Sequence, residues 1–90
     1  MKSILITGSS SGIGAAICEY FSAKGWKVFG SVRNVKDGDK LSNICGTNFT
    51  PLLFDVTDRN AIGIAVAEVE SKLDGSGLDC LVNNAGINIS

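Results

Sequence analysis

Two kinds of hydrophobic pattern alternate along the chain, and their order predicts strands separated by helices. Short apolar runs, of which Ile4-Leu5-Ile6 is the first, are rich in β-branched residues and bounded by glycine or polar residues, as in buried parallel strands. Between these runs, apolar residues recur every three or four positions, which is typical of a helix that buries one face. The predicted strands are residues 4–6, 26–32, 49–54 and 78–82, and the predicted helices are residues 13–24, a short segment within 34–48, and residues 59–73.

The two longer helices are each expected to pack through a single apolar stripe. Gly25 stands where the first helix should stop. Before the short helix, the run Asp37-Gly38-Asp39 is interpreted as a solvated turn, because it lacks the later ligands and the closing glutamate of a calcium loop. The stripe of the first helix comprises Ile13, Ile17, Tyr20 and Phe21, and that of the last comprises Ile62, Ala65, Val66, Val69 and Leu73.

A glycine-rich turn joins the first strand directly to the first helix. Gly8, Gly12 and Gly14 are spaced G-x-x-x-G-x-G. Gly8 can supply a tight turn, Gly12 lets the main chain approach a ligand, and Gly14 lets the helix pack closely on the strand. Backbone N–H groups at the start of a helix have no acceptor within the chain, and they bind anions with help from the helix dipole. The turn therefore predicts a phosphate-binding site, to which the hydroxyl groups of residues 9–11 add donors.

Two other motifs compete for the same residues. A Walker loop requires a lysine directly after its second glycine, and no lysine follows these glycines. The run from Gly8 to Gly12 also matches the nucleophile elbow G-x-S-x-G, which would make Ser10 the nucleophile of an acyl-transfer hydrolase. The chain contains no histidine, so Ser10 lacks the base that a serine-hydrolase triad needs. Phosphate binding is therefore favoured over both alternatives.

Together with its neighbours, the stretch Thr7-Gly-Ser-Ser-Ser-Gly-Ile-Gly14 resembles the coenzyme-binding motif of the short-chain dehydrogenase/reductase family. Asp55-Val56, after the third strand, looks like the pair that holds the adenine ring in that family. Asn83-Asn84-Ala85-Gly86, after the fourth strand, matches the family's N-N-A-G motif, which stabilises the sheet and lines the nicotinamide-side ribose. The resemblance implies that the coenzyme is bound by Gly8, Ser9, Ser10, Ser11, Gly12, Ile13, Gly14, Asp55, Val56, Asn83, Ala85 and Gly86.

Arg33 bears on the choice of coenzyme. In a dinucleotide fold the adenosine ribose lies just past the second strand, where an acidic residue bonds the 2′-hydroxyl of NAD and an arginine pairs with the 2′-phosphate of NADP. Val32 stands where NAD-preferring relatives carry the acidic residue, and Arg33 follows it. The sequence therefore favours NADP(H) over NAD, and the alternative is a solvated arginine without a role in binding.

The resemblance implies a Rossmann-type doubly wound parallel sheet in the α/β class, of which residues 1–90 form the first half with strand order 3-2-1-4. This half would be one incomplete dinucleotide-binding domain. The catalytic Ser, Tyr and Lys of the family lie beyond a position equivalent to Ser90, so no catalytic residue is expected here and the chain alone should be inactive. Tyr20 and Lys24 have the family's Y-x-x-x-K spacing, but core packing of Tyr20 explains it better.

The implied function is therefore the NADP(H)-binding portion of an oxidoreductase that transfers hydride between nicotinamide and a carbonyl or alcohol substrate. The alternative is a stand-alone, non-catalytic dinucleotide-binding module. An open reading frame that continues past Ser90 and encodes Y-x-x-x-K would favour the first over the second.

Composition narrows the range of partners. A net charge of −1 gives no basic field for nucleic acid and no cationic face for a membrane. The start has no signal-peptide pattern and no apolar stretch nears 18 residues, so we expect a cytoplasmic location. Cys18, Cys45 and Cys80 are widely spaced and are expected to be reduced, mostly buried and not metal-binding. The outer edge of the fourth strand would be bare, which favours self-association.

Overall fold

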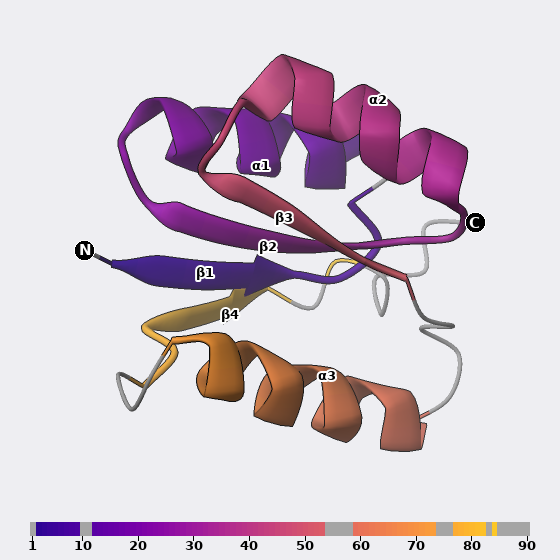
Figure 1. The fold of residues 1–90 in the computed structure, drawn as a ribbon, viewed down its shortest axis with the longest axis vertical. Coiled ribbons are helices and arrows are strands. Elements are labelled where there is room, and N and C mark those ends of the chain that lie inside the picture. The colour runs from indigo at the N-terminus through magenta and orange to yellow at the C-terminus, as the bar shows by residue number, and fades with distance from the viewer. Residues whose placement is uncertain (1, 10–11, 54–58, 74–76, 83, 85–90) are drawn as a thin grey trace.

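A computed structural model of the chain contains four parallel strands in the order β3-β2-β1-β4, which confirms the predicted half of a doubly wound sheet (Figure 1). It describes residues 2–9, 12–53, 59–73, 77–82 and 84. The elements are β1 (Ser3–Ile6), α1 (Gly12–Ala23), β2 (Lys27–Val32), α2 (Val35–Cys45), β3 (Phe49–Leu53), α3 (Arg59–Lys72) and β4 (Cys80–Val82).

The strand β1 lies inside the sheet and pairs in parallel with both β2 and β4. The helices α1 and α2 cover one face of the sheet, and α3 covers the other (Figure 1). Because all four strands run the same way, Gly8 after β1, Arg33 after β2 and Asn84 after β4 all lie at one edge of the sheet. The predicted site residues cluster in sequence at these strand ends.

Alternation of side chains along the strands divides the core into two clusters. On β1, Ile4 and Ile6 point toward α1 and α2, whereas Leu5 points toward α3. Burying each such side chain contributes about 1.5–3 kcal/mol of hydrophobic stabilisation. The first cluster comprises Ile4, Ile6, Cys18, Val28, Leu41 and Phe49, and the second comprises Leu5, Phe29, Leu52, Ala65 and Val69.

The predicted apolar stripe of α1 is wrong in two of its four residues. Ile13 is 60% exposed and Tyr20 is 56% exposed, so core packing does not explain Tyr20. The helix instead buries Gly14, Cys18 and Ser22, which are spaced four residues apart. Small residues at these positions let α1 approach the sheet closely, and the spacing of the helix places Ile13 and Tyr20 on its other side.

Tyr20 meets Lys24 at the surface. The Nζ atom of Lys24 lies 5.0 Å from the centre of the Tyr20 ring, a cation–π arrangement one helical turn apart. Pairing of these two side chains at the surface, rather than core packing, therefore explains the Y-x-x-x-K spacing.

The interpretation of residues 37–39 as a solvated turn is also wrong, because they belong to α2. The helix begins early because the side chain of Asn34 caps it, accepting a hydrogen bond of 2.8 Å from the backbone N–H of Asp37. Gly38 is buried, and a β-carbon added there would lie 3.1 Å from Pro51 and 3.3 Å from Val32. The glycine that indicated a turn therefore lets α2 pack closely on the sheet.

The stripe predicted for α3 is confirmed where its side chains are described. Ala65 and Val69 are buried, and Val66 and Leu73 pack against them. The side chain of Ile62 lies outside the described part of the chain. Within that part, no helix is long and apolar enough to cross a membrane.

The three cysteines differ in burial. Cys18 is buried, Cys45 is half-buried and Cys80 is exposed, so the expectation of mostly buried thiols is wrong for Cys80.

Candidate functional site

The chain passes from β1 through a glycine turn into α1, as the sequence predicts. Thr7 continues the strand by donating a backbone hydrogen bond of 2.9 Å to Val82. Gly8 then has φ +66° and Gly12 has φ +57°, a left-handed conformation that glycine adopts without steric cost. The turn therefore depends on glycine at both positions, and it directs the first N–H groups of α1 toward the edge where the strands end.

Gly14 lies where the helix meets the turn. A β-carbon at Gly14 would overlap the carbonyl oxygen of Gly8 and come within 2.8 Å of the side-chain nitrogen of Asn84. Such separations are too short for real side chains, and the nearest atom belongs to backbone that cannot rotate away. Gly14 therefore allows close packing of helix and strand, the role that its place in the motif predicts.

Asn84 ties the end of β4 to the glycine turn. Its side-chain nitrogen donates a hydrogen bond of 3.0 Å to the carbonyl oxygen of Gly8. Asn84 was not among the predicted coenzyme-binding residues, but its N-N-A-G motif was predicted to stabilise the sheet, and this contact confirms that role for Asn84. The motif was therefore the signal for it, and the contact adds a sheet-stabilising bond across the turn.

Ser31 ties the turn to β2 on the other side. The backbone N–H of Gly8 donates to the Oγ atom of Ser31 over 2.7 Å, and the backbone N–H of Ser9 donates to the carbonyl oxygen of Ser31 over 2.9 Å. The hydroxyl group of Ser9 donates to the same carbonyl oxygen over 2.7 Å. Sequence reasoning missed Ser31, since a serine within an otherwise apolar strand is only a weak signal.

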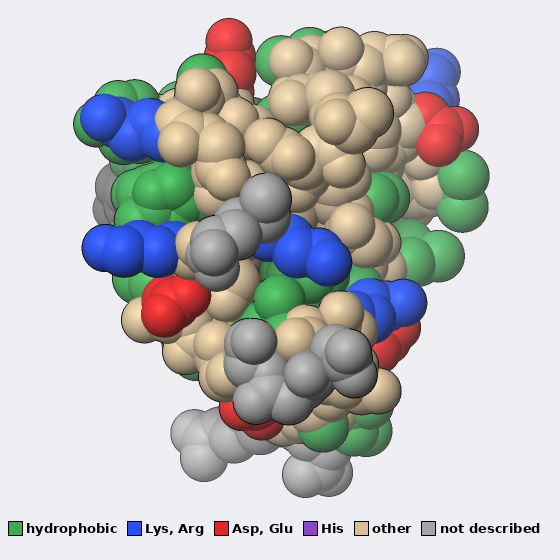
Figure 2. Space-filling view, turned by 60° about the vertical axis from the view of Figure 1, so that its left-hand side comes forward, with side chains coloured by type: hydrophobic (Ala, Val, Ile, Leu, Met, Phe, Trp, Pro, Cys, Tyr) green, Lys and Arg blue, Asp and Glu red, His purple; other side chains and the backbone are tan. Residues whose placement is uncertain are grey.

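Arg33 is exposed and follows directly after β2, at the edge where the turn lies. The next residue, Asn34, caps α2, so Arg33 stands between the end of a strand and the start of a helix. Figure 2 shows Lys and Arg side chains of one face separated by acidic, apolar and uncharged groups rather than gathered into one basic field.

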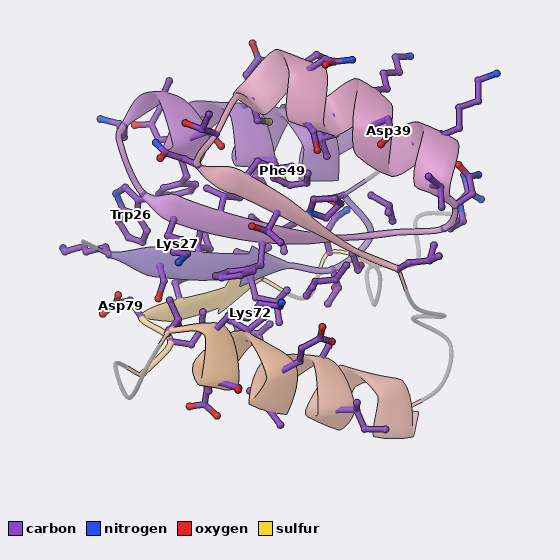
Figure 3. All side chains as sticks on the ribbon, in the orientation of Figure 1. Trp26, Lys27, Asp39, Phe49, Lys72 and Asp79 are labelled. Atoms are coloured by element: carbon purple, nitrogen blue, oxygen red, sulfur yellow. The ribbon has the colours of Figure 1, made fainter. Side chains whose placement is uncertain are left out.

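At the other ends of the strands, where the strands begin, a different contact joins β1 to the residue before β4. Asp79 accepts a hydrogen bond of 2.8 Å from the backbone N–H of Ser3, and the hydroxyl group of Ser3 lies 3.3 Å from the same carboxylate oxygen. Figure 3 shows Asp79 and Trp26 at this edge, where the strands begin. The charged groups there are remote from the glycine turn.

The described part of the site contains no activated nucleophile. Cys18 packs beneath the turn, where burial and the neighbouring Cys45 raise the pKa of its thiol to about 12, although a hydrogen bond with Ser9 acts in the opposite direction. The thiol is therefore neutral at physiological pH. No group of three potential metal ligands occurs in the described ranges.

The structure brings together Gly8, Ser9, Gly12, Ile13 and Gly14 in the turn, with Arg33 at the same edge. The remaining predicted site residues lie outside the described residues and stay predictions; they are Ser10, Ser11, Asp55, Val56, Asn83, Ala85 and Gly86.

Comparison with known proteins is consistent with this geometry. A family model described as short chain dehydrogenase matches residues 2–90. NADPH-dependent 3-dehydrocapnine reductase of Ornithobacterium rhinotracheale is 47% identical over 87 residues, which cover 97% of this chain and 31% of that protein. Serine 3-dehydrogenase of Rhizobium radiobacter is 42% identical over 85 residues, covering 93% of this chain and 33% of that protein.

A third relative carries a different substrate in its name. The 3-oxoacyl-[acyl-carrier-protein] reductase FabG of Haemophilus influenzae is 38% identical over 86 residues, which cover 96% of this chain and 35% of that protein. The chain thus spans about a third of the length of these curated relatives.

Proposed function

The chain belongs to the short-chain dehydrogenase family, and from this premise we propose that it is the coenzyme-binding portion of a nicotinamide-dependent oxidoreductase. The observation that carries the proposal is the packing of Gly14 against Gly8, which brings the start of α1 onto the end of β1. The first N–H groups of a helix have no acceptor within the helix, and with the positive end of the helix dipole they favour binding of a diphosphate.

NADP(H) is the proposed coenzyme. Arg33 is exposed directly after β2, where its guanidinium group is free to pair with the 2′-phosphate of the adenosine ribose. The name of one relative, the 3-dehydrocapnine reductase, states that this enzyme depends on NADPH. An exposed arginine and the absence of an acidic residue at position 32 together support NADP(H) over NAD.

The other predicted residues complete the proposed site. Asp55 would accept a hydrogen bond from the adenine amine and Val56 would line the ring, while Asn83, Ala85 and Gly86 would line the nicotinamide-side ribose. The coenzyme, when bound, supplies or accepts a hydride at its nicotinamide ring. The role of this chain is to bind and orient it.

Hydride exchange with a carbonyl or alcohol substrate is the proposed activity of the whole protein. The catalytic Ser, Tyr and Lys are proposed to lie in the part of the protein that corresponds to the remaining two thirds of the relatives. The 90 residues alone should therefore bind coenzyme without turning over substrate, and NADPH oxidation with a panel of carbonyl compounds tests this. Measurable turnover would contradict it.

Titration with NADPH and NADH tests the coenzyme assignment. We expect tighter binding of NADPH by the wild type, and a loss of about tenfold in NADPH affinity in Arg33→Ala, with NADH affinity unchanged. Lys40→Ala is the matched control, because Lys40 is an exposed cation on α2 outside the proposed site, and it should bind NADPH as the wild type does. Equal affinities for both coenzymes before and after the Arg33 substitution would remove Arg33 from the site, and no binding of either would refute the proposed function.

Self-association is the remaining proposal for this chain, through the outer edge of β4. Among the described strands β4 pairs only with β1, and Leu81 on it is 46% exposed. An unpaired edge strand is a template for pairing with a second copy. Light scattering coupled to size-exclusion chromatography should give a mass above 9.4 kDa, and a monomeric mass at high concentration would contradict the proposal.

A further inference from the structure

We infer that Ser31 is a positioning residue for coenzyme binding, which holds the glycine turn at a fixed place relative to Arg33. The inference depends on the proposed function, since it concerns how the same site is held ready for its ligand. Ser31 lies on β2, only two residues before Arg33, and its hydrogen bonds run to the turn after β1.

Three hydrogen bonds connect Ser31 to the turn, and they engage the first two residues after Thr7. The Oγ atom of Ser31 accepts from the N–H of Gly8, and its carbonyl oxygen accepts from both the N–H and the hydroxyl group of Ser9. Ser31 is 1% exposed and Ser9 is fully buried, so the two bonds between these residues are shielded from water, whereas the bond to Gly8 is part-buried. Together the three bonds hold the start of the turn against β2.

The bond to Gly8 determines which N–H groups remain for a ligand. Because the N–H of Gly8 is taken by Ser31, an anion at the turn must bind N–H groups further toward α1. Loss of the Ser31 hydroxyl would leave the half-buried N–H of Gly8 without its acceptor, and the turn would rearrange to pair that group with water. A coenzyme would then have to restore the turn on binding, which lowers affinity.

The residue before Ser31 packs tightly against the turn. A β-carbon at Gly30 would lie 2.5 Å from the Oγ atom of Ser9 and 2.8 Å from the ring of Phe49, so β2 lies directly against the turn. A ligand that contacts both the turn and Arg33 binds more tightly when the distance between them is fixed in advance. The affinity of a ligand that contacts only Arg33 does not depend on that distance.

This difference supplies the test. The ligands are NADPH, which would span the turn and Arg33, and adenosine 2′-phosphate, which carries the 2′-phosphate but no diphosphate. The variants are Ser31→Ala, which removes the hydroxyl acceptor of the Gly8 N–H, and Ser31→Thr, which keeps a hydroxyl at this position. Ser3→Ala is the matched control, because Ser3 is also a buried serine on the sheet with cross-strand hydrogen bonds, but it lies at the opposite edge.

We expect Ser31→Ala to lose about tenfold in NADPH affinity and to keep its affinity for adenosine 2′-phosphate. Ser31→Thr should recover most of the loss, and Ser3→Ala should bind both ligands as the wild type does. Equal weakening toward both ligands, or no weakening toward NADPH, would overturn the inference while leaving the proposed function intact. Failure of the wild type to bind either ligand would refute the proposed function and the inference with it.

A measurement on the wild type keeps the inference testable if Ser31→Ala does not fold. The amide proton of Gly8 should exchange slowly with solvent in the absence of ligand, because it is bonded to a buried oxygen. Exchange of this proton at the rate of an unprotected amide would overturn the inference.

Discussion

The side-chain nitrogen of Asn84 donates a hydrogen bond of 3.0 Å to the carbonyl oxygen of Gly8, which joins two residues that are 76 positions apart in the sequence. The strand that precedes Asn84 makes a second link, because Thr7 donates its backbone N–H to Val82. Ser31 holds the turn from the β2 side. The glycine turn is thus fixed from both neighbouring strands, and its shape depends on residues outside the glycine motif.

Substitution of Asn84 should destabilise the fold by an amount that depends on charge. Asn84→Ala removes one hydrogen bond and should cost about 1 kcal/mol in the free energy of unfolding. Asn84→Asp should lower the free energy of unfolding further, because a carboxylate would face the carbonyl oxygen of Gly8. The same carboxylate would repel an anion at the turn and so weaken its binding. Urea denaturation of both variants measures the difference. Asn43→Ala, at an exposed position of α2, should stay within about 0.5 kcal/mol of the wild type, and an equally stable Asn84→Asp would contradict the assigned contact.

Alanine should have opposite effects at two helical glycines. Gly14→Ala should lower the free energy of unfolding by about 1–3 kcal/mol, since its β-carbon would overlap the backbone of Gly8. Gly63→Ala should raise it by about 0.5–1 kcal/mol, because Gly63 is exposed on α3 and a β-carbon there meets no atom within 4 Å. Thermal or urea denaturation compares the two variants directly. A Gly14→Ala variant as stable as Gly63→Ala would show that helix and turn do not pack closely.

The strands, the helices and the turn between β1 and α1 could be predicted because they follow from local patterns, and the family resemblance implied the strand order. Short apolar runs alternate with helical spacing, and right-handed connections then leave few arrangements of the sheet. The glycine spacing likewise predicted a strand, turn and helix in that order. These features depend on residues that are neighbours in the sequence.

The errors arose where packing between distant elements decides the outcome. Hydrophobicity alone placed Tyr20 in the core, but α1 buries the stripe that contains Gly14 and Cys18, and Tyr20 lies on the other side of the helix. The glycine at 38 indicated a turn, yet contact with Pro51 makes it a packing residue of α2. Ser31 has a role only because β2 lies beside the turn, which no pattern around position 31 reveals.

The buried thiol of Cys18 should make the protein less stable at alkaline pH. Burial raises its pKa to about 12, from an ordinary value of 9.0 that applies in the unfolded chain. Between these values the unfolded chain releases the thiol proton while the folded protein keeps it. Unfolding therefore becomes more favourable as the pH rises above 9, by at most about 1.4 kcal/mol per pH unit for one proton. Well below pH 9 the thiol contributes no pH dependence, since it is protonated in both states.

Cys18→Ala isolates this effect. The variant loses some packing at every pH, but its free energy of unfolding should fall less steeply than that of the wild type between pH 9 and pH 10.5. Urea denaturation at pH 7, 9, 10 and 10.5 measures both curves. Cys80→Ala is the control, because the exposed Cys80 on β4 has no comparable burial, and it should keep the wild-type slope. Parallel curves for the wild type and Cys18→Ala would show that the thiol beneath the glycine turn is not buried in solution, and that α1 packs less closely on β1 than Gly14 allows.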